Sequence, residues 1–286
     1  MAIVWLNGRY LDERRARLPV TDPVFRWGVG LFEVVRGYHG RPFRLEDHLS
    51  RLRRSADRLS IDTRRLPGLS RVIPRLLARN ELRSGRVRIS VTGAGNVLIE
   101  ARRHAPPDGR IGERGAKLVV APWRRDPAAP LAGHKTLNYH ELVLARDAAA
   151  RLGAVDALIL DPGGRVLEGT RSNVFAVLGG GLLTPDVPRG VLPGVTRKVV
   201  LELAQGLRIR TRPARLTLAR LLGADEVFVT STMMEVVPVA RIDRQSIGRP
   251  GPVTRALSEA YRRCVERECG SPTRAAGRSS RRGGSA

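Results

Sequence analysis

Cysteine, lysine, aromatic residues and long apolar runs are all scarce in this sequence. The 286 residues include 2 cysteines, and aromatic residues make up 4% of the chain. Cys264 and Cys269 are too few to build a zinc site, and their spacing favours reduced surface thiols over a disulfide. The 5 histidines show no metal-binding spacing either. The sequence therefore predicts no metal site.

The longest apolar segments also fall short of the length that a membrane span requires, about 18 residues. The N-terminus has no basic segment followed by an apolar one, so it does not resemble a signal peptide. These absences predict a soluble cytoplasmic protein. With 42% hydrophobic and 27% charged residues, the chain can bury one large core or two moderate ones.

Negative charge is scarce as well, and the formal net charge is +24. Such a charge favours nucleic-acid binding, because neutralised phosphates release counterions. The 51 basic residues are spread along the chain, however, and nearly all are arginine, which is typical of a bias in coding composition. Few aromatic residues are present to stack on bases. A nucleic-acid-binding protein therefore remains only the distant alternative.

Apolar periodicity and turn residues predict two α/β or α+β domains without a regular βαβ alternation. Asn7-Gly8 indicates a β-hairpin at the start. The Pro-, Ala- and Gly-rich segment 126–133 predicts an inter-domain connection, with an N-terminal α/β domain at 1–125 and a C-terminal domain at 134–270. The basic segment 271–286 lacks apolar periodicity and predicts a disordered tail.

Helical spacing of apolar residues marks five segments of the chain. The clearest pattern follows the lysine at position 135 and ends at a glycine. Another segment is interrupted by a proline at position 74. The expected helices cover residues 45–59, 69–82, 138–153, 194–206 and 253–269.

Lysine occurs only 3 times, at Lys117, Lys135 and Lys198. Lys117 opens an apolar strand and Lys198 lies in the first turns of a helix, where solvated lysines are usual. Lys135, in the stretch HKTLNY, lies in a bend before a helix, and loops often carry functional groups. Covalent amine catalysis requires a lysine that loses its proton and attacks a carbonyl. Taken alone, Lys135 is most simply interpreted as a surface charge. That interpretation is weakened because the chain uses arginine for nearly every other positive charge.

The stretch LPGVTR predicts a helix start at Gly194, Val195 and Thr196. Free backbone N–H groups and the positive end of the helix dipole would together form an anion site there, with the Thr196 hydroxyl as a further donor. An ordinary capped helix is the simpler interpretation of this motif on its own. Ser231 and Thr232, at the end of an apolar run, are similarly either anion donors or turn residues.

Glu168 and Arg51, taken singly, are most simply interpreted as charged residues exposed to solvent. Glu168 ends a short strand before a Gly-Thr turn, where a carboxylate is usually solvated. Arg51, in the stretch HLSRL, points off the apolar stripe of its helix. Neither residue indicates a site by itself.

Six blocks in order nevertheless resemble the class IV, or fold-type IV, pyridoxal-phosphate enzymes over about residues 3 to 260. That family includes branched-chain aminotransferases, D-amino-acid transaminases and 4-amino-4-deoxychorismate lyases. The resemblance implies a two-domain, D-amino-acid-aminotransferase-like fold with the cofactor between the domains, and a homodimer whose partner helps to close the active site. The blocks are FRWGVGLFEVVR, HLSRL, KTLNY, EGTRSNVF, LLTPDVPRGVLPGVTR and DEVFVTSTMMEVVPV.

The resemblance gives three residues roles around the reactive part of the cofactor, pyridoxal 5'-phosphate. Lys135 matches the lysine that holds the cofactor as a Schiff base and moves the α-proton of the substrate. Glu168 matches the acid that pairs with the pyridine nitrogen, where a carboxylate keeps that nitrogen protonated. Tyr139 matches the tyrosine that hydrogen-bonds the phenolic oxygen of the cofactor.

The resemblance also assigns the phosphate end of the cofactor. Arg51 matches the phosphate-binding arginine, and it is joined by the backbone N–H groups of Val195 and Thr196, the Thr196 hydroxyl, and Thr232. A fixed positive charge combined with the oriented donors of a helix start suits a dianionic phosphate.

The reaction is less clearly indicated than the cofactor. The segment VTGAGNVLIEARR lacks both the Arg-x-His pair of D-amino-acid transaminases and the glycine-rich turn with an arginine of the lyases. PLAGHKTLN resembles the lyases, whereas Tyr139 and FEVVRGY resemble the transaminases. We predict an aminotransferase acting on an amino acid, with branched-chain ones as candidates, and a 2-oxo acid. Arg36 and Arg88 are the candidates for binding a substrate carboxylate. The alternative is a 4-amino-4-deoxychorismate lyase that releases pyruvate and p-aminobenzoate.

Overall fold

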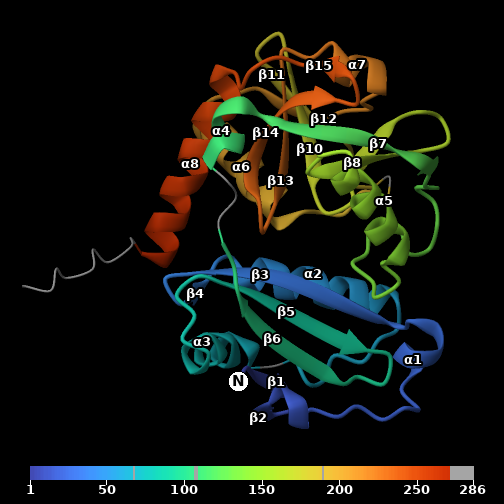
Figure 1. Ribbon diagram of the computed structural model, residues 1–286, viewed down its shortest axis with the longest axis vertical. Helices are drawn as coiled ribbons and strands as arrows, with labels where there is room; N and C mark the ends of the chain where they lie inside the picture. Colours follow the sequence, from blue (N-terminus) through green and yellow to red (C-terminus); the bar gives the residue numbers. More distant parts are fainter. Residues whose placement is uncertain (67, 106–108, 189, 271–286) are drawn as a thin grey trace, which may run out of the picture.

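The computed structural model describes residues 1–66, 68–105, 109–188 and 190–270. Two β-sheets with their helices form two domains that are stacked along the long axis of the molecule (Figure 1). This mixed α/β arrangement agrees with the predicted fold class. The predicted tail at 271–286 lies outside the described residues.

The first sheet has six strands and is antiparallel between all paired neighbours. Asn7 and Gly8, both with positive φ, form the turn of the first hairpin, as predicted. In spatial order the strands are β2 (Arg9–Asp12), β1 (Ile3–Leu6), β6 (Val97–Arg103), β5 (Gly85–Thr92), β3 (Gly30–Tyr38) and β4 (Arg41–Pro42).

The two faces of this sheet differ because side chains alternate along each strand. Leu31 and Val35 of β3 and Ile89 of β5 point into a core that is covered by α2 (Leu45–Arg58) and α3 (Leu69–Arg79). Phe32, Val34, Arg86 and Arg88 alternate with these residues and line a cavity facing the second domain. The first domain therefore offers one face of its sheet to the site.

The second sheet has nine strands. Its antiparallel hairpins are joined by parallel pairs at β7, so no regular βαβ alternation occurs among the described strands. In spatial order the strands are β12 (Thr211–Pro213), β11 (Gly181–Thr184), β10 (Asn173–Leu178), β13 (Glu226–Ser231), β14 (Glu235–Ile242), β7 (Ala116–Arg124), β8 (Asp156–Leu160) and β9 (Val166–Gly169), with β15 (Gln245–Ser246) paired to β14.

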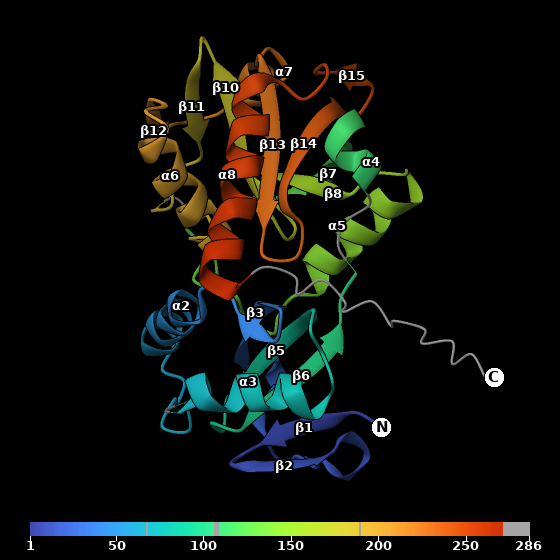
Figure 2. The same ribbon diagram turned by 90° about the vertical axis from the view of Figure 1, so that its left-hand side faces the viewer.

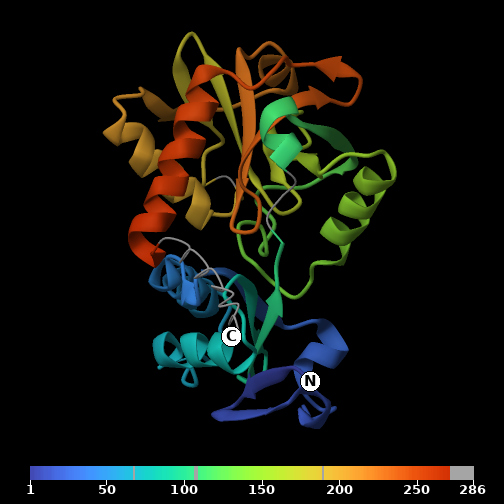
Figure 3. The ribbon, with the colours of Figure 1, turned by 60° about the vertical axis from the view of Figure 1, so that its left-hand side comes forward.

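Helices α6 (Val195–Gly206) and α8 (Pro252–Cys269) cover one face of this sheet (Figure 2). Helix α5 (His140–Arg151) packs against β7 and β8. The last turns of α8 lie over the start of α2 (Figure 3), where Arg44 forms an ion pair with Glu268 at 3.0 Å. The remaining helical segments are short: α1 (Pro23–Trp27), α4 (Gly109–Arg114), α7 (Leu218–Leu222) and a 3₁₀ turn at Glu13–Arg15.

The domain division at residue 125 needs correction. Strand β7 pairs with β14 and β8 of the second sheet, so the chain leaves the first sheet after Arg103 and enters the second at Ala116. The irregular segment 126–133 lies inside the second domain and leads to Lys135. Its Pro and Gly residues lie in turns of the second domain rather than in a connection between domains.

The cysteines also differ from the prediction in one respect. Both thiols are free, as expected, but Cys264 and Cys269 are buried on the inner face of α8 rather than exposed. Among the described residues, no helix is long and apolar enough to cross a membrane, and no cluster of His, Cys, Asp or Glu suits a metal ion.

Candidate active site

A cavity of about 360 Å³ lies where the first sheet and α2 meet the second domain. This volume falls within the usual range of small-molecule sites, about 300–1,000 Å³. Of the residues predicted for the site, one does not line the cavity, namely Arg36. The others all do: Arg51, Arg88, Lys135, Tyr139, Glu168, Val195, Thr196 and Thr232.

Lys135 belongs to a segment that runs from the second domain to the first and forms backbone hydrogen bonds with β3. The Phe32 N–H donates to the Lys135 carbonyl at 2.9 Å, and the Leu137 N–H donates to the Gly30 carbonyl at 2.9 Å. The Lys135 Nζ lies 4.5 Å from the centre of the Phe32 ring. The backbone of the first domain thus fixes the lysine at the cavity wall.

The surroundings of Lys135 lower the pKa of its side-chain amine. Burial and the nearby Arg51 charge lower the pKa of Lys135 to about 8, although Glu33 and Glu168 act in the opposite direction. Removing an ammonium group from water disfavours its charged form, and a second positive charge adds to that effect. Near neutral pH a useful fraction of this amine is therefore neutral and able to attack a carbonyl.

Glu168, near the end of β9 in the second sheet, is buried and lines the cavity. Its Oε1 accepts from the Arg125 guanidinium at 2.5 Å, and its Oε2 accepts from the Leu192 N–H at 3.0 Å. Buried Asp156 supports the following turn by accepting from the Thr170 N–H at 3.1 Å and the Ser172 hydroxyl at 2.7 Å. The carboxylate of Glu168 is thus held in place by its neighbours rather than solvated.

Tyr139 precedes α5 and packs edge-to-face on Phe32, with ring centroids 5.1 Å apart. Its hydroxyl donates to the Thr170 carbonyl, and burial raises the pKa of this phenol well above its usual value. The hydroxyl therefore keeps its proton. Its predicted contact with the phenolic oxygen of the cofactor stays a prediction.

The start of α6 forms the end of the cavity that suits an anion. Val195 and Thr196 open this 12-residue helix, with their N–H groups in its first turn. Gly194 is required there because a Cβ atom would lie 1.8 Å from Asn173 Oδ1. Thr230, 1% exposed, also lines the cavity, and its hydroxyl has no partner among the described residues. A buried hydroxyl without a partner is rare and indicates a ligand at this end.

Arg51 is buried, with 5% exposure, so its default as a solvated residue is wrong. Its Nε and one terminal nitrogen donate to Glu33 at 2.7 and 2.8 Å, and its other terminal nitrogen donates to the Pro193 carbonyl at 3.0 Å. His48 lies beside it and contacts Glu33 at 2.9 Å. Arg51 therefore connects α2 to the chain that enters α6.

The two candidates for substrate binding lie in different surroundings. Arg88 faces the cavity with its guanidinium 3.9 Å from the centre of the Phe32 ring. Arg36 is 4% exposed and forms an ion pair with Glu235 at 2.8 Å, and it also donates to the Met233 carbonyl at 3.3 Å. Arg36 thus supports the turn between β13 and β14, while Arg88 lies where it can meet a ligand.

Sequence reasoning missed several residues of the site. Glu33 lies within the apolar run LFEVV and has no motif of its own, and Arg125 pairs with Glu168 across 43 positions. Arg86, two residues before Arg88 on the same face of β5, also lines the cavity. Period-2 alternation along RVRIS could have found Arg86 once Arg88 was chosen. No local pattern reveals the partners of Glu33.

Comparison with known proteins supports this picture. The profile of the family described as amino-transferase class IV matches residues 30–242. A Methanocaldococcus jannaschii protein, provisionally named a branched-chain-amino-acid aminotransferase, is 36% identical in an alignment of 276 positions that covers 91% of this chain and 95% of that one. The D-alanine aminotransferase of Staphylococcus haemolyticus is 30% identical, covering 93% of this chain and 99% of its own.

The remaining similarities extend to a lyase and to a solved structure. The aminodeoxychorismate lyase of Bacillus subtilis is 29% identical, covering 92% of this chain and 95% of its own. The crystal structure of the branched-chain aminotransferase from the thermophilic archaeon Thermoproteus uzoniensis with norvaline superimposes with a TM-score of 0.84 at 30% identity, covering 92% of this chain and 94% of that one.

Proposed function

Because the chain belongs to the class IV aminotransferase family, we propose that it is a pyridoxal-phosphate-dependent aminotransferase. It would move an amino group between an amino acid and a 2-oxo acid. The observation that carries the proposal is Lys135, an amine with a pKa of about 8 at the wall of a cavity of cofactor size. Nearly every other positive charge of the chain is an arginine, which cannot perform this chemistry.

The groups around Lys135 suit the cofactor at two separate points. Buried Glu168 supplies a carboxylate for the pyridine nitrogen. Arg51, the start of α6 and the unpartnered Thr230 hydroxyl supply donors for the phosphate. The bound cofactor would withdraw electrons from the α-carbon of the substrate and make its proton acidic. The neutral Lys135 amine can accept that proton and return it.

Named relatives suggest candidate substrates. The Methanocaldococcus jannaschii relative and the Thermoproteus uzoniensis structure carry branched-chain names, so we propose branched-chain amino acids as the first substrates to examine. The lyase remains the second candidate, because the stretch PLAGHKTLN resembles that group and the Bacillus subtilis lyase aligns over 92% of the chain. A homodimer and a cytoplasmic location remain part of this proposal.

The first test is colour. Purified protein mixed with pyridoxal 5'-phosphate is expected to develop the yellow absorbance band of lysine-bound cofactor, and Lys135→Ala is expected to abolish it. Lys198→Ala, which removes a half-exposed lysine of α6 that does not line the cavity, serves as the matched control and should keep the band. A wild-type protein that stays colourless would contradict the proposal.

The second part of that test separates the reactions. A panel of L- and D-amino acids is added to the yellow protein, and conversion to pyridoxamine 5'-phosphate is followed by absorbance. Conversion with any amino acid supports an aminotransferase. Release of pyruvate from aminodeoxychorismate without such conversion supports the lyase.

A further inference from the structure

Glu33 is buried behind Arg51 and does not line the cavity. We propose that Glu33 is a positioning residue, which aims the Arg51 guanidinium at the cofactor phosphate from a buried site on β3. This inference rests on the proposed function, and it assigns a role to a residue that does not line the cavity.

The geometry around Glu33 gives its carboxylate a full set of donors. Its two oxygens accept from two nitrogens of Arg51 at 2.7 and 2.8 Å, an arrangement that fixes the plane of the guanidinium. His48 contacts the same carboxylate at 2.9 Å. Since an ionised carboxylate only accepts hydrogen bonds, His48 Nδ1 must be the donor. His48 and Arg51 lie three residues apart on α2, so both face β3.

The bonds of Arg51 leave hydrogens for a ligand. A guanidinium has five N–H groups. Glu33 takes one from Nε and one from a terminal nitrogen, and the Pro193 carbonyl takes one from the other terminal nitrogen. One hydrogen on each terminal nitrogen therefore remains. Because Arg51 lines the cavity beside Gly194 and Val195, these hydrogens are available to an anion at the start of α6.

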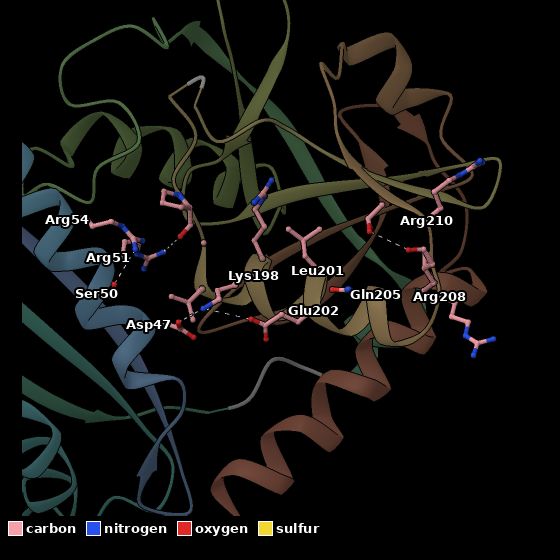
Figure 4. Close-up of a pocket in the computed structure, with 16 residues that line it drawn as sticks. Asp47, Ser50, Arg51, Arg54, Lys198, Leu201, Glu202, Gln205, Arg208 and Arg210 are labelled. Carbon is pink, nitrogen blue, oxygen red and sulfur yellow. Dashed lines mark hydrogen bonds and ion pairs between the residues drawn. The ribbon is translucent and has the colours of Figure 1, made fainter.

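The hydrogen bonds from Arg51 to Glu33 are needed because the Arg51 side chain also borders a second groove. A groove of about 880 Å³ runs between α2 and α6 on the other side of Arg51 (Figure 4). Acidic Asp47 and Glu202 line this groove, and Asp47 already attracts Lys198 there at 2.5 Å. Without Glu33, Arg51 could rotate into the groove and find an acidic partner away from the phosphate.

The pKa of Glu33 agrees with an ion pair between Glu33 and Arg51 that persists at neutral pH. Burial alone would raise the pKa of Glu33, but the Arg51 charge and the hydrogen bonds from His48 and Arg51 hold it well below its usual range. Burial lowers the pKa of His48, so its ring is neutral at neutral pH. Glu33 therefore stays ionised and offsets part of the positive charge of Arg51. Its hydrogen bonds leave free the two N–H groups of Arg51 that are available to an anion in the cavity.

The test compares two ligands that differ only in the phosphate. Glu33→Gln keeps the shape of the side chain but removes its charge. We expect it to weaken binding of pyridoxal 5'-phosphate about tenfold, as loss of one charged hydrogen bond would. Binding of pyridoxal, which has no phosphate, should change less than about threefold. Asp62→Asn, which breaks the exposed pair with Arg64, is the matched control and should leave both affinities unchanged.

A double variant tests whether Glu33 acts through Arg51. If it does, Glu33→Gln should add almost nothing to the loss of affinity already caused by Arg51→Ala. Additive losses, or an equal loss for pyridoxal and its phosphate, would overturn the inference. If Glu33→Gln does not fold, His48→Asn replaces it, and we expect a smaller loss confined to the phosphorylated ligand. No loss for either ligand in His48→Asn would also contradict the inference.

The two proposals fail in different ways. A wild-type protein that forms no yellow species with pyridoxal 5'-phosphate would contradict the proposed function itself. A yellow wild-type protein whose Glu33→Gln variant binds both ligands normally would contradict only the role of Glu33.

Discussion

At the scale of single residues, Lys135 makes the pH dependence of the site predictable. Its pKa of about 8 lies below the usual value of 10.5 because burial and Arg51 disfavour the ammonium form. The amine is therefore mostly protonated below about pH 8 and mostly neutral above it, so its reactive fraction rises with pH. We expect the rate at which dilute acetic anhydride labels Lys135 in cofactor-free protein to rise with pH and to be half-maximal near pH 8.

Mass spectrometry can follow this labelling, with an added lysine peptide as the reference of ordinary pKa. Arg51→Gln removes a charge that lowers the pKa of Lys135, so its half-maximal pH should be higher than in the wild-type protein. Labelling of wild-type Lys135 that follows the reference peptide up to about pH 10 would show that the amine is not perturbed.

The sequence predicted the residues that carry chemistry better than those that hold them. Lys135 was conspicuous because the chain almost always uses arginine, and Glu168 and Arg51 lie in recognisable blocks. Glu33 was missed because a carboxylate within an apolar run gives no local signal. Its partners come from a helix 15 and 18 positions away, and only the packing of α2 on β3 brings them together.

At the scale of elements, the start of α6 depends on one glycine. Gly194 precedes the helix with ordinary backbone angles, so its role is space rather than conformational freedom. A methyl group there would lie 1.8 Å from Asn173 Oδ1, and Asn173 itself donates to the Leu192 carbonyl at 2.9 Å. Any side chain at position 194 must therefore displace either the helix start or Asn173.

Gly194→Ala is expected to reduce the free energy of unfolding by about 1–3 kcal/mol, as overpacking usually does. It should also weaken binding of pyridoxal 5'-phosphate, because the N–H groups of Val195 and Thr196 would move. Urea denaturation and a binding titration measure the two effects. Gly206→Ala, at the other end of α6, has open space around it and should be neutral or slightly stabilising.

A second substitution identifies the cause. Asn173→Ala removes the oxygen that a methyl group at position 194 would meet, so it should restore part of the stability lost in Gly194→Ala. If the double variant is less stable than both single variants, the clash is not the reason for the loss.

The predicted elements show which patterns are reliable. Helices α2, α5, α6 and α8 lie within a few residues of their predicted bounds, because α2 has a clear apolar stripe and the other three have a glycine near at least one end. Pro74 did not interrupt α3, which continues from Leu69 to Arg79. The chain tolerates proline there in the second turn, close to the helix start, where few intrahelical bonds are lost.

At the scale of the whole molecule, the sequence predicted two domains but not which strand belongs to which. Strand β7 follows the first domain along the chain, yet it pairs with strands that come much later in the sequence. Sheet membership depends on such long-range pairing, and an apolar run of strand length fits either sheet equally well. The Pro- and Gly-rich segment 126–133 was the strongest local break, but its turns lie within the second domain.

An ion pair and hydrogen bonds connect the two domains next to the cavity. Arg36 and Tyr38 of β3 both contact Glu235 Oε1, at 2.8 and 2.9 Å, and His104 contacts the Met233 carbonyl at 3.1 Å. Glu235 has a φ of 61°, which is unusual for a residue other than glycine. The first domain therefore holds the β13–β14 turn, which carries Thr232 at the cavity wall, in a conformation that it would not favour alone.

Arg36→Met is expected to reduce the free energy of unfolding by roughly 2–3 kcal/mol, because it leaves the largely buried Glu235 carboxylate without its cation. Glu235→Gln should cost less, since Gln can still accept from Arg36 and Tyr38. In the double variant Arg36→Met/Glu235→Leu no unpaired charge remains, so part of the loss should be recovered. Urea denaturation of the wild-type protein and these variants gives the stability differences. If Arg36→Met instead leaves stability unchanged and raises only the KM for the amino acid, Arg36 binds the substrate directly, and the fastening of the two domains must reside in Tyr38 and His104.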